Sequence, residues 1–240
     1  MPRFPIKQSQ IKNGQATISG SDYRHIVKVL RLQIGNTITL FDESGMEHLG
    51  KIQEITTKEI SIAIAESRNA ETESKLNIHL LQGIPKGDKM DLIVEKATEL
   101  GVKTIIPIIT ERAQVRETKK IQRWQRIAVE SSKQCGRVKP PEIHEAISFQ
   151  EAVQFNNNSD LRIILYEKYK DRLQDTLRKV TEFPVNVVLF IGPEGGFSED
   201  EVKTAQQKGF ITSGLGPRIL RTETAGIVAI AVLQFVYGDI

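Results

Sequence analysis

The residues best placed to do chemistry form a glycine-rich loop near the C-terminal end of the chain. The loop, GPEGG at 192–196, directly follows an apolar run at 187–191 that is typical of a buried strand. Glycine lets backbone N–H and C=O groups approach a ligand closely, and open parallel sheets bind ligands beyond the carboxyl ends of their strands. The loop is therefore either a binding site or a tight turn that needs glycine for its own geometry. It carries neither the Walker A nor the GxGxxG phosphate fingerprint.

A second glycine-rich loop follows the next apolar run, as SGLGPRILR at 213–221. It carries Arg218 and Arg221 and leads into Thr222, which the sequence predicts as a helix N-cap. Glu223 then falls in the first helical turn, where a negative charge suits the helix dipole. The segment is either part of a binding site or an ordinary strand-to-helix connection with arginines at the surface. Two such loops after successive strands favour a binding site built by both.

The two loops resemble the signature loops of the SPOUT-class RNA methyltransferases. More narrowly, they are similar to those of the RsmE family, which methylates N3 of a uridine in the 16S RNA of the small ribosomal subunit. The matching segments run through the whole chain and are His25 with residues 29–31, KGDKMD at 86–91, EKATELGV at 95–102, TER at 110–112, RW at 123–124, QCGR at 134–137, IGPEGGFS at 191–198 and LGPRILRTETA at 215–225. Cys135 and Ala113 stand where the family pattern has serine, which replaces one small residue by another.

This resemblance implies both an architecture and an activity. The expected fold is a small PUA-like RNA-binding β-barrel, residues 1–72, followed by an α/β methyltransferase domain, residues 73–240, which ends in a trefoil knot. The expected activity is an S-adenosylmethionine-dependent transfer of a methyl group to 16S ribosomal RNA, as a step of rRNA processing in ribosome biogenesis. The family also implies a homodimer whose active sites use both subunits, and a substrate within a small-subunit particle.

Site residues follow from the loops and the chemistry. Recognition of adenine and ribose needs backbone hydrogen bonds and apolar walls more than it needs charges. The residues expected to bind the cofactor are Ile191, Gly192, Glu194, Gly195, Gly196, Leu215, Gly216, Ile219, Leu220, Thr224 and Ala225. Uridine N3–H is a weakly acidic imide, so its anion needs a base or a cation beside it. Arg221 is predicted to stabilise the uracil oxygens, and Glu194 and Glu223 are candidate bases. Loop capping by Glu194 and a helix-dipole role for Glu223 are the alternatives.

The net charge of +3 conceals an uneven distribution. Residues 112–139 hold nine Lys or Arg against two acidic residues, whereas residues 141–240 hold ten against fourteen. A charged run is often only a solvated face, but an excess of this size favours a surface for a polyanion such as RNA. The residues expected to contact RNA are Arg3, Arg24, Lys28, Arg31, Lys86, Lys89, Arg112, Arg116, Arg123, Gln134 and Arg137.

The pattern of predicted strands and helices divides the chain into two parts. Residues 15–19, 36–41, 47–55 and 59–65 read as strands and 22–31 as a helix capped by Ser21, whereas 66–75 (ESRNAETESK) reads as a polar linker. Beyond it, near-continuous apolar strands alternate with helices, which predicts a parallel sheet covered on both faces. Ser198 and Glu201 predict a capping box at one helix start.

Composition excludes several classes. With 240 residues, 39% of them hydrophobic, the chain can bury a core, so disorder and collagen are excluded. One cysteine, Cys135, cannot form an internal disulfide, and four scattered histidines show no ligand spacing, so no metal site is expected. The beginning, MPRFPIKQSQ, lacks the apolar core of a signal peptide, and no apolar run is long enough to span a bilayer. A cytoplasmic protein is expected.

Other functions stay open at this point. One is a different SPOUT enzyme, such as a ribose 2′-O-methyltransferase or a transfer RNA enzyme. Another is a non-catalytic RNA-binding protein in which the α/β part serves only for dimerisation. A metabolite-binding nucleotide enzyme is disfavoured by the missing phosphate fingerprints and the basic segment.

Overall fold

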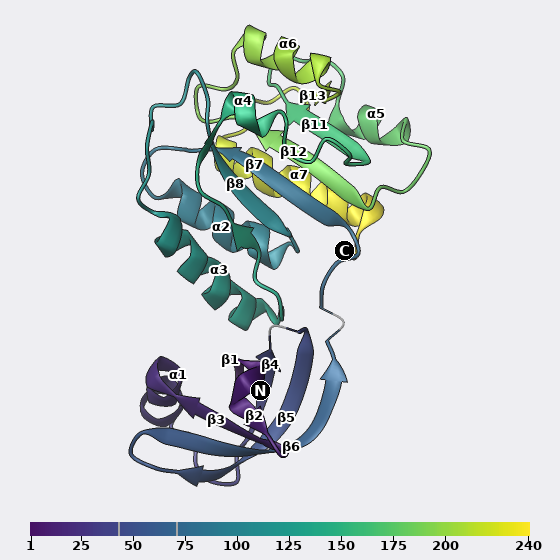
Figure 1. The fold of residues 1–240 in the computed structure, drawn as a ribbon. Helices are drawn as coiled ribbons and strands as arrows, with labels where there is room; N and C mark the ends of the chain where they lie inside the picture. The colour runs from purple at the N-terminus through teal and green to yellow at the C-terminus, as the bar shows by residue number, and fades with distance from the viewer. Residues whose placement is uncertain (43, 71) are drawn as a thin grey trace. The chain divides into compact units, whose positions relative to one another are not determined.

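The computed structural model describes residues 1–42, 44–70 and 72–240, which fall into two compact units (Figure 1). The first unit comprises Met1–Glu73 and also Ser132–Lys139, and the second comprises Ser74–Ser131 and Pro140–Ile240. Residues 132–139 join the first unit through polar contacts, among them the hydrogen bond from Arg3 to the carbonyl oxygen of Gly136 at 2.6 Å. Contacts between segments so distant in sequence leave no local pattern, so the sequence does not predict this return of the chain.

The first unit is built on a six-stranded sheet with the order β1-β4-β5-β6-β3-β2. The strands are β1 (Arg3–Ile6), β2 (Ile11–Lys12), β3 (Gln15–Ser19), β4 (Thr37–Asp42), β5 (Met46–Ile55) and β6 (Glu59–Asn69). The pair β1–β4 is parallel and the others are antiparallel. Ile60 and Ile62 of β6 are fully buried, as their alternation predicts. The predicted linker is wrong at 66–69, because there β6 continues as a strand paired with β5.

A short helical segment accompanies this sheet. Helix α1 (Gly20–Arg24) follows a 3₁₀ turn η1 (Gln8–Gln10) earlier in the chain and continues into a π-helical turn η2 (His25–Val29). The N-cap is Ser19 rather than the predicted Ser21, and its side chain makes no capping bond. The predicted helix also ends before Arg31, whose φ of 52° lies in the left-handed region. Ile26 is the buried anchor of this segment.

The second unit contains a fully parallel sheet, as the sequence predicts, with the order β10-β8-β7-β12-β11-β13 and with β9 beside β8. The strands are β7 (Asn77–Gly83), β8 (Thr104–Ile109), β9 (Glu142–Ile143), β10 (Ile147–Ser148), β11 (Leu161–Leu165), β12 (Asn186–Ile191) and β13 (Ile211–Ser213). Strands β8, β11 and β12 are buried along almost their whole length, because helices cover both faces of the sheet.

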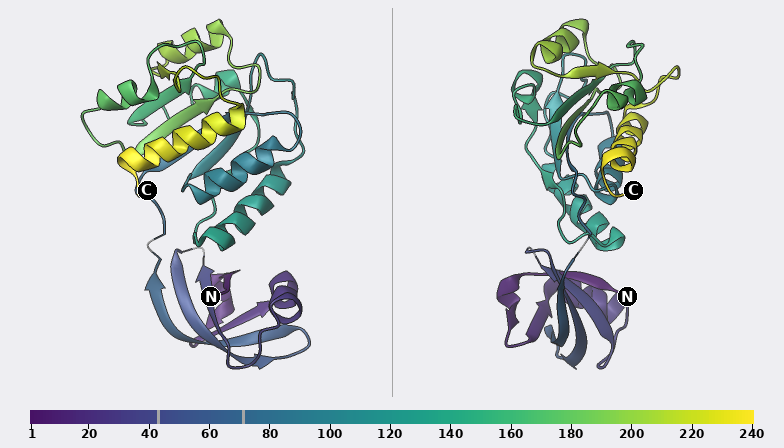
Figure 2. Two further views of the ribbon diagram at one scale, coloured as in Figure 1. Left: turned by 180° about the vertical axis from the view of Figure 1, so that it is seen from behind. Right: turned by 90° about the vertical axis from the view of Figure 1, so that its right-hand side faces the viewer.

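The helices that follow β7 in the described part of the chain are α2 (Lys89–Glu99), α3 (Ile121–Cys135), α4 (Phe149–Ala152), α5 (Leu173–Arg178), α6 (Glu199–Gln207) and α7 (Thr222–Tyr237). Helices α2, α3 and α7 lie on one face of the sheet, and α4 and α6 on the other (Figures 1 and 2). Each face has its own buried apolar cluster. The predicted capping box of α6 is confirmed: Ser198 Oγ accepts from Glu201 N, and the Glu201 carboxylate accepts from Ser198 N. Among the described residues, no helix is long and apolar enough to cross a membrane.

Candidate functional site

A cavity of about 490 Å³ opens beyond the carboxyl ends of β11, β12 and β13. Its lining residues are Lys89, Leu165, Tyr166, Glu167, Ile191, Gly192, Pro193, Glu194, Gly195, Gly196, Leu215, Gly216, Arg218, Ile219, Leu220, Arg221, Thr222 and Ala225. The two glycine-rich loops, separated by more than fifteen residues in sequence, therefore face one another across a single cavity. Parallel strands place all their carboxyl ends at one edge of the sheet, which is why successive strand-loop junctions meet here.

All of the residues predicted to bind a cofactor line this cavity except Thr224, which lies exposed on α7. Arg221 and Glu194, two of the three predicted catalytic residues, line it as well, and Glu223 does not. The structure thus gathers the predicted set in one place. The identity of the ligand and the role of each residue stay predictions at this level.

Close approach explains why the first loop uses glycine. A Cβ added to Gly195 would lie 3.0 Å from Arg112 Cβ and 3.1 Å from the Arg112 carbonyl oxygen. Gly196 has a φ of +66°, and a Cβ there would lie 3.0 Å from both carboxylate oxygens of Glu167. A side chain at Gly195 would therefore push the loop away from the backbone of Arg112, and at Gly196 the positive φ itself strains any residue with a side chain. The same lack of side chains leaves the backbone of the loop open to the cavity.

Glu194 holds the first loop against the start of α2. Its carboxylate accepts hydrogen bonds from Lys89 Nζ at 2.7 Å and from the backbone N–H of Lys86 at 3.1 Å. Partial burial by itself would raise the pKa of this carboxyl group, but these donors hold the pKa below its ordinary value. A carboxylate that is ionised and already paired is a weak proton acceptor, so the geometry favours the loop-capping alternative for Glu194.

The second loop ends at the start of α7. The predicted N-cap role of Thr222 is wrong, because the N-cap residue is Arg221 and Thr222 is the first helical residue. The Thr222 hydroxyl instead donates to the Gly192 carbonyl oxygen at 2.5 Å, which ties the two loops together. The side chains of Arg218 and Arg221 are exposed at the cavity. Glu223 lies in the first turn of α7, and among the described residues its buried Oε2 has no hydrogen-bond partner.

Sequence reasoning missed several lining residues: Leu165, Tyr166, Glu167, Pro193, Arg218 and Thr222. For Leu165, Tyr166 and Glu167 the sequence does contain a signal. The apolar run at 161–165 predicts a strand, and a parallel strand brings the residues after it to the same edge as the glycine-rich loops. Arg218 and Thr222 lie inside the second loop and its helix start, and were singled out there without a binding role.

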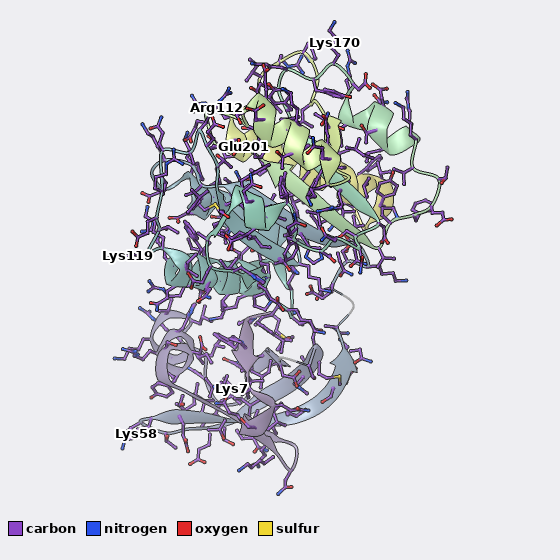
Figure 3. All side chains as sticks on the ribbon, turned by 45° about the horizontal axis from the view of Figure 1, so that its top comes forward. Lys7, Lys58, Arg112, Lys119, Lys170 and Glu201 are labelled. Carbon is purple, nitrogen blue, oxygen red and sulfur yellow. The ribbon has the colours of Figure 1, made fainter. Side chains whose placement is uncertain are left out.

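The predicted RNA-binding residues of the second unit are partly engaged by the protein itself. Arg123 pairs with Asp91 of α2 at 2.5 Å, although its side chain is half exposed. Arg116 donates to the carbonyl oxygens of residues 110 and 111. Arg112 is exposed and donates to the Gly195 carbonyl oxygen at 3.3 Å, beside the cavity. Figure 3 labels Arg112 together with Lys119, which lies exposed just before α3.

The corresponding residues of the first unit divide in the same way. Arg137, whose side chain is 7% exposed, pairs with Glu73 at 2.7 Å. Arg3 pairs with the buried Glu47 in addition to Gly136. Four predicted RNA-binding residues at the surface are Arg24, Lys28, Arg31 and Gln134. Within the described part of the chain, no three His, Cys, Asp or Glu residues are grouped so that they could hold a metal ion.

Comparison with known proteins extends these observations to the whole chain. Residues 72–234 match the family described as RNA methyltransferase domain, and residues 18–65 match the RNA methyltransferase PUA domain. Over 244 aligned residues the chain is 35% identical to ribosomal RNA small subunit methyltransferase E of Buchnera aphidicola, with coverage of 100% of this chain and 95% of the relative.

Two solved structures are similar over nearly their full length. One is a methyltransferase of Legionella pneumophila in complex with the cofactor SAM, with a TM-score of 0.88, 35% identity and coverage of 99% of this chain and 98% of that one. The other is ribosomal RNA small subunit methyltransferase E of Neisseria gonorrhoeae bound to S-adenosyl methionine, with a TM-score of 0.86, 35% identity and coverage of 100% and 99%.

Proposed function

The chain belongs to the ribosomal RNA small subunit methyltransferase E family, with a SPOUT α/β domain preceded by a PUA-like domain, and we propose that it transfers a methyl group from S-adenosylmethionine to N3 of a uridine in 16S ribosomal RNA. The observation that carries the proposal is the single cavity formed by the two family loops. Relatives of the same length and fold have been solved with the methyl donor bound.

The cavity fits the donor in size and chemistry. Pockets for ligands of this size commonly measure about 300–1,000 Å³ and combine apolar walls with a few polar groups, and the volume here is about 490 Å³. Ile191, Leu215 and Leu220 offer apolar surface, and the glycines leave backbone groups accessible. The donor, when bound, supplies a methyl group already activated on a sulfonium, so the residues must mainly position the two reactants.

Arg221 is the residue we assign to the uridine. Removal of the N3 proton places negative charge on the ring nitrogen and the two uracil oxygens, and a guanidinium beside them lowers the energy of that anion. Arg221 is exposed and lines the cavity, and the ion pairs found among the described residues do not include it. Arg218 of the same loop lies nearby and provides a comparison for any test of this assignment.

Neither predicted base gains support from the geometry. Glu194 is committed to Lys89 and to the backbone of Lys86, and Glu223 is not part of the cavity lining. We therefore place the main catalytic contribution in stabilisation of the uridine anion by Arg221, and leave proton removal unassigned to either carboxylate.

For the RNA, we propose that each unit contributes its own exposed members of the predicted set. These are Arg24, Lys28, Arg31 and Gln134 in the first unit, and Lys86, Arg112, Arg116 and Arg123 in the second. Phosphate contacts position an RNA and require charges that can reach it. The arginines engaged in buried or half-buried ion pairs, Arg3 and Arg137, then support the first unit instead. We infer that the substrate is a small-subunit particle in the cytoplasm.

We also propose the homodimer and the trefoil knot that the family implies. An exposed stripe on α7 supports the dimer: Val228 is 36% and Phe235 75% exposed, with Leu92 of the adjacent α2 at 42%. Val228 and Phe235 are seven residues apart, about two helical turns, so both lie on the same face of α7, and an exposed apolar face of this kind is typical of one that packs against a partner. The trefoil knot is proposed because the chain belongs to this family. Sedimentation equilibrium that shows only monomer would refute the dimer.

The decisive experiment is mass spectrometry of ribosomal RNA from cells that lack the protein, with and without complementation. We expect one methylated uridine of the small-subunit RNA to disappear and to return with the wild-type gene. Primer extension should arrest at the same nucleotide, because N3 methylation blocks Watson–Crick pairing and ribose 2′-O-methylation does not.

A non-catalytic RNA-binding protein is tested by calorimetry. We expect binding of S-adenosylmethionine to folded protein. Absence of binding, in protein whose unfolding transition is cooperative, would overturn the enzyme proposal.

A further inference from the structure

A buried glutamine outside the cavity lining is linked by hydrogen bonds to both glycine-rich loops. Gln82 lies next to the end of β7 and is completely buried. Its Nε2 donates to the Gly83 carbonyl oxygen at 3.0 Å and to Thr222 Oγ1 at 2.9 Å. Thr222 Oγ1 then donates to the Gly192 carbonyl oxygen at 2.5 Å. This relay runs from β7 through the start of α7 to the end of β12.

The direction of the relay is fixed by the groups in it. A hydroxyl has one proton, and that of Thr222 is donated to the Gly192 carbonyl, so the contact with Gln82 must be one in which Thr222 accepts. The Gly83 carbonyl can also only accept. Both hydrogens of the Gln82 amide are therefore used, and the assignment of its nitrogen and oxygen follows from the network.

The opposite end of the same amide is left without a partner. Gln82 Oε1 is buried and has no hydrogen-bond donor among the described residues. It faces α7 where Gly226 stands, at which an added Cβ would lie 3.4 Å away. A buried acceptor without a partner destabilises a fold. The two hydrogen bonds that the same amide donates offset part of that cost.

The residues bridged are those that shape the cavity. Gly192 and Thr222 line it from the two different loops. Gly83 packs directly against the first loop, because a Cβ on it would lie 2.5 Å from Pro193. The end of β7 therefore contacts both loops at once, by close packing on one side and by the relay on the other.

We propose that Gln82 is a positioning residue, which fixes the loops at 192–196 and 213–221 relative to one another through Thr222 and so preforms the cavity for the methyl donor. This inference rests on the proposed function, because S-adenosylmethionine is the ligand whose binding it affects. Gln82 does not line the cavity and acts on the donor only through the backbone of the loops.

The test compares two buried glutamines of the same unit. Gln234, near the C-terminal end of α7, is as buried as Gln82 and also makes hydrogen bonds, to the Leu100 carbonyl and the Ser74 hydroxyl. Gln82→Met and Gln234→Met each remove an amide with little change of shape. Titration calorimetry with S-adenosylmethionine and thermal unfolding are measured for both variants and the wild type.

We expect both variants to lose stability, and only Gln82→Met to raise the Kd for S-adenosylmethionine, by about tenfold, which equals about 1.4 kcal/mol. Thr222→Val should raise the Kd to a similar extent, whereas Thr222→Ser, which keeps the hydroxyl, should have the Kd of the wild type. The double variant Gln82→Met/Thr222→Val should have a Kd little higher than that of either single variant, because both changes break the same relay.

The outcomes separate the two proposals. An unchanged Kd for Gln82→Met, or an equal rise for Gln234→Met, would overturn the role of Gln82. If Gln82→Met does not fold, the Thr222 variants decide the question. An unchanged Kd for Thr222→Val would overturn the proposed role of the relay, whereas a raised Kd for Thr222→Val together with a wild-type Kd for Thr222→Ser would support it. Failure of the wild-type protein to bind S-adenosylmethionine would instead refute the proposed function.

Discussion

The sequence predicts the cavity from two glycine-rich loops and part of the RNA-binding set from a basic run at 112–139, and the structure treats the two sets of residues differently. In the cavity, loops that are separate in sequence converge, and nearly every predicted residue lies in the lining. Among the basic residues, Arg137 and Arg3 pair with Glu73 and Glu47 of the protein itself, whereas Arg123 pairs with Asp91 and stays half exposed.

This contrast follows from what each kind of sequence pattern constrains. A glycine-rich loop after a strand constrains backbone geometry, and the parallel sheet then fixes where the loop must lie. A basic residue constrains only charge, and a long flexible side chain can reach either a phosphate or a carboxylate of its own protein. Position in a charged run is thus weaker evidence for RNA contact than position in a loop is for ligand contact.

The largest effect expected is at Arg221. Arg221→Ala should lower the methylation rate about 10³-fold, within the range found when one group that stabilises developing charge is removed. The Kd for S-adenosylmethionine should change by less than about threefold, because the side chain is assigned to the uridine. Single-turnover methylation and calorimetry measure the two quantities.

Arg218→Ala is the matched control for this prediction, since Arg218 belongs to the same loop and is also exposed at the cavity. A smaller loss of rate than for Arg221→Ala is expected. If Arg221→Ala instead abolishes donor binding, Arg221 belongs to the donor pocket and the assignment to uridine is wrong.

The next effect is steric and tests the cavity directly. Gly195→Val should raise the Kd for S-adenosylmethionine about 10²-fold, because a Cβ already meets Arg112 at 3.0 Å and the two further methyl groups force the loop to move. Gly195→Ala should show a smaller rise of the same sign. Equal affinity for wild type and both variants, measured by calorimetry, would contradict the role of this loop.

The fold was predictable where the sequence signal is local. The parallel sheet, the Ser198–Glu201 capping box and the alternation in β6 each depend on neighbouring residues. The cavity was predictable because the strand pattern and the loops imply their own placement. Three features depend on distant pairs and were missed: the return of residues 132–139 to the first unit, the contact of Thr222 with Gly192, and the relay through Gln82. Side-chain hydrogen bonds across so many residues leave no periodicity in the sequence.

A smaller effect separates the inward and outward basic residues. Arg137→Ala should destabilise the protein by about 2 kcal/mol, less than a fully buried pair because Glu73 is 26% exposed. Lys28→Ala, at an exposed position of the same unit, should change stability by less than about 0.5 kcal/mol. Urea unfolding measures both.

RNA binding provides the complementary measurement. If Lys28 contacts a phosphate, Lys28→Ala should reduce the slope of log K against log salt concentration by about 0.7 to 0.9. Arg137→Ala should leave the slope unchanged under conditions where the variant is folded. A reduced slope for Arg137→Ala would show that an inward pairing does not prevent RNA contact, and would remove the distinction between the two groups.

The smallest expected effect is the pH dependence of stability that comes from the ion pair between Glu194 and Lys89. Glu194 belongs to the cavity loop, and Lys89 to the residues predicted to bind RNA. The pKa of Glu194 is held below its ordinary value in the folded protein, so the pair stabilises the fold above the unfolded pKa of about 4.3, and that stability is lost as the pH falls through the folded pKa. The carboxylate is 32% exposed, so solvent limits the effect to a few tenths of a kcal/mol.

When the pH is lowered from 7 to 3, the free energy of unfolding measured with urea should therefore fall less for Glu194→Gln than for the wild type. Glu199→Gln is the matched control, because Glu199 is more exposed, at 67%, and its contact with Lys168 is longer, at 3.5 Å. We expect the control to follow the wild type. If Glu194→Gln also follows it, Lys89 is not held by this pairing and stays available to RNA, and the separation between cavity and RNA-binding surface at this residue is lost.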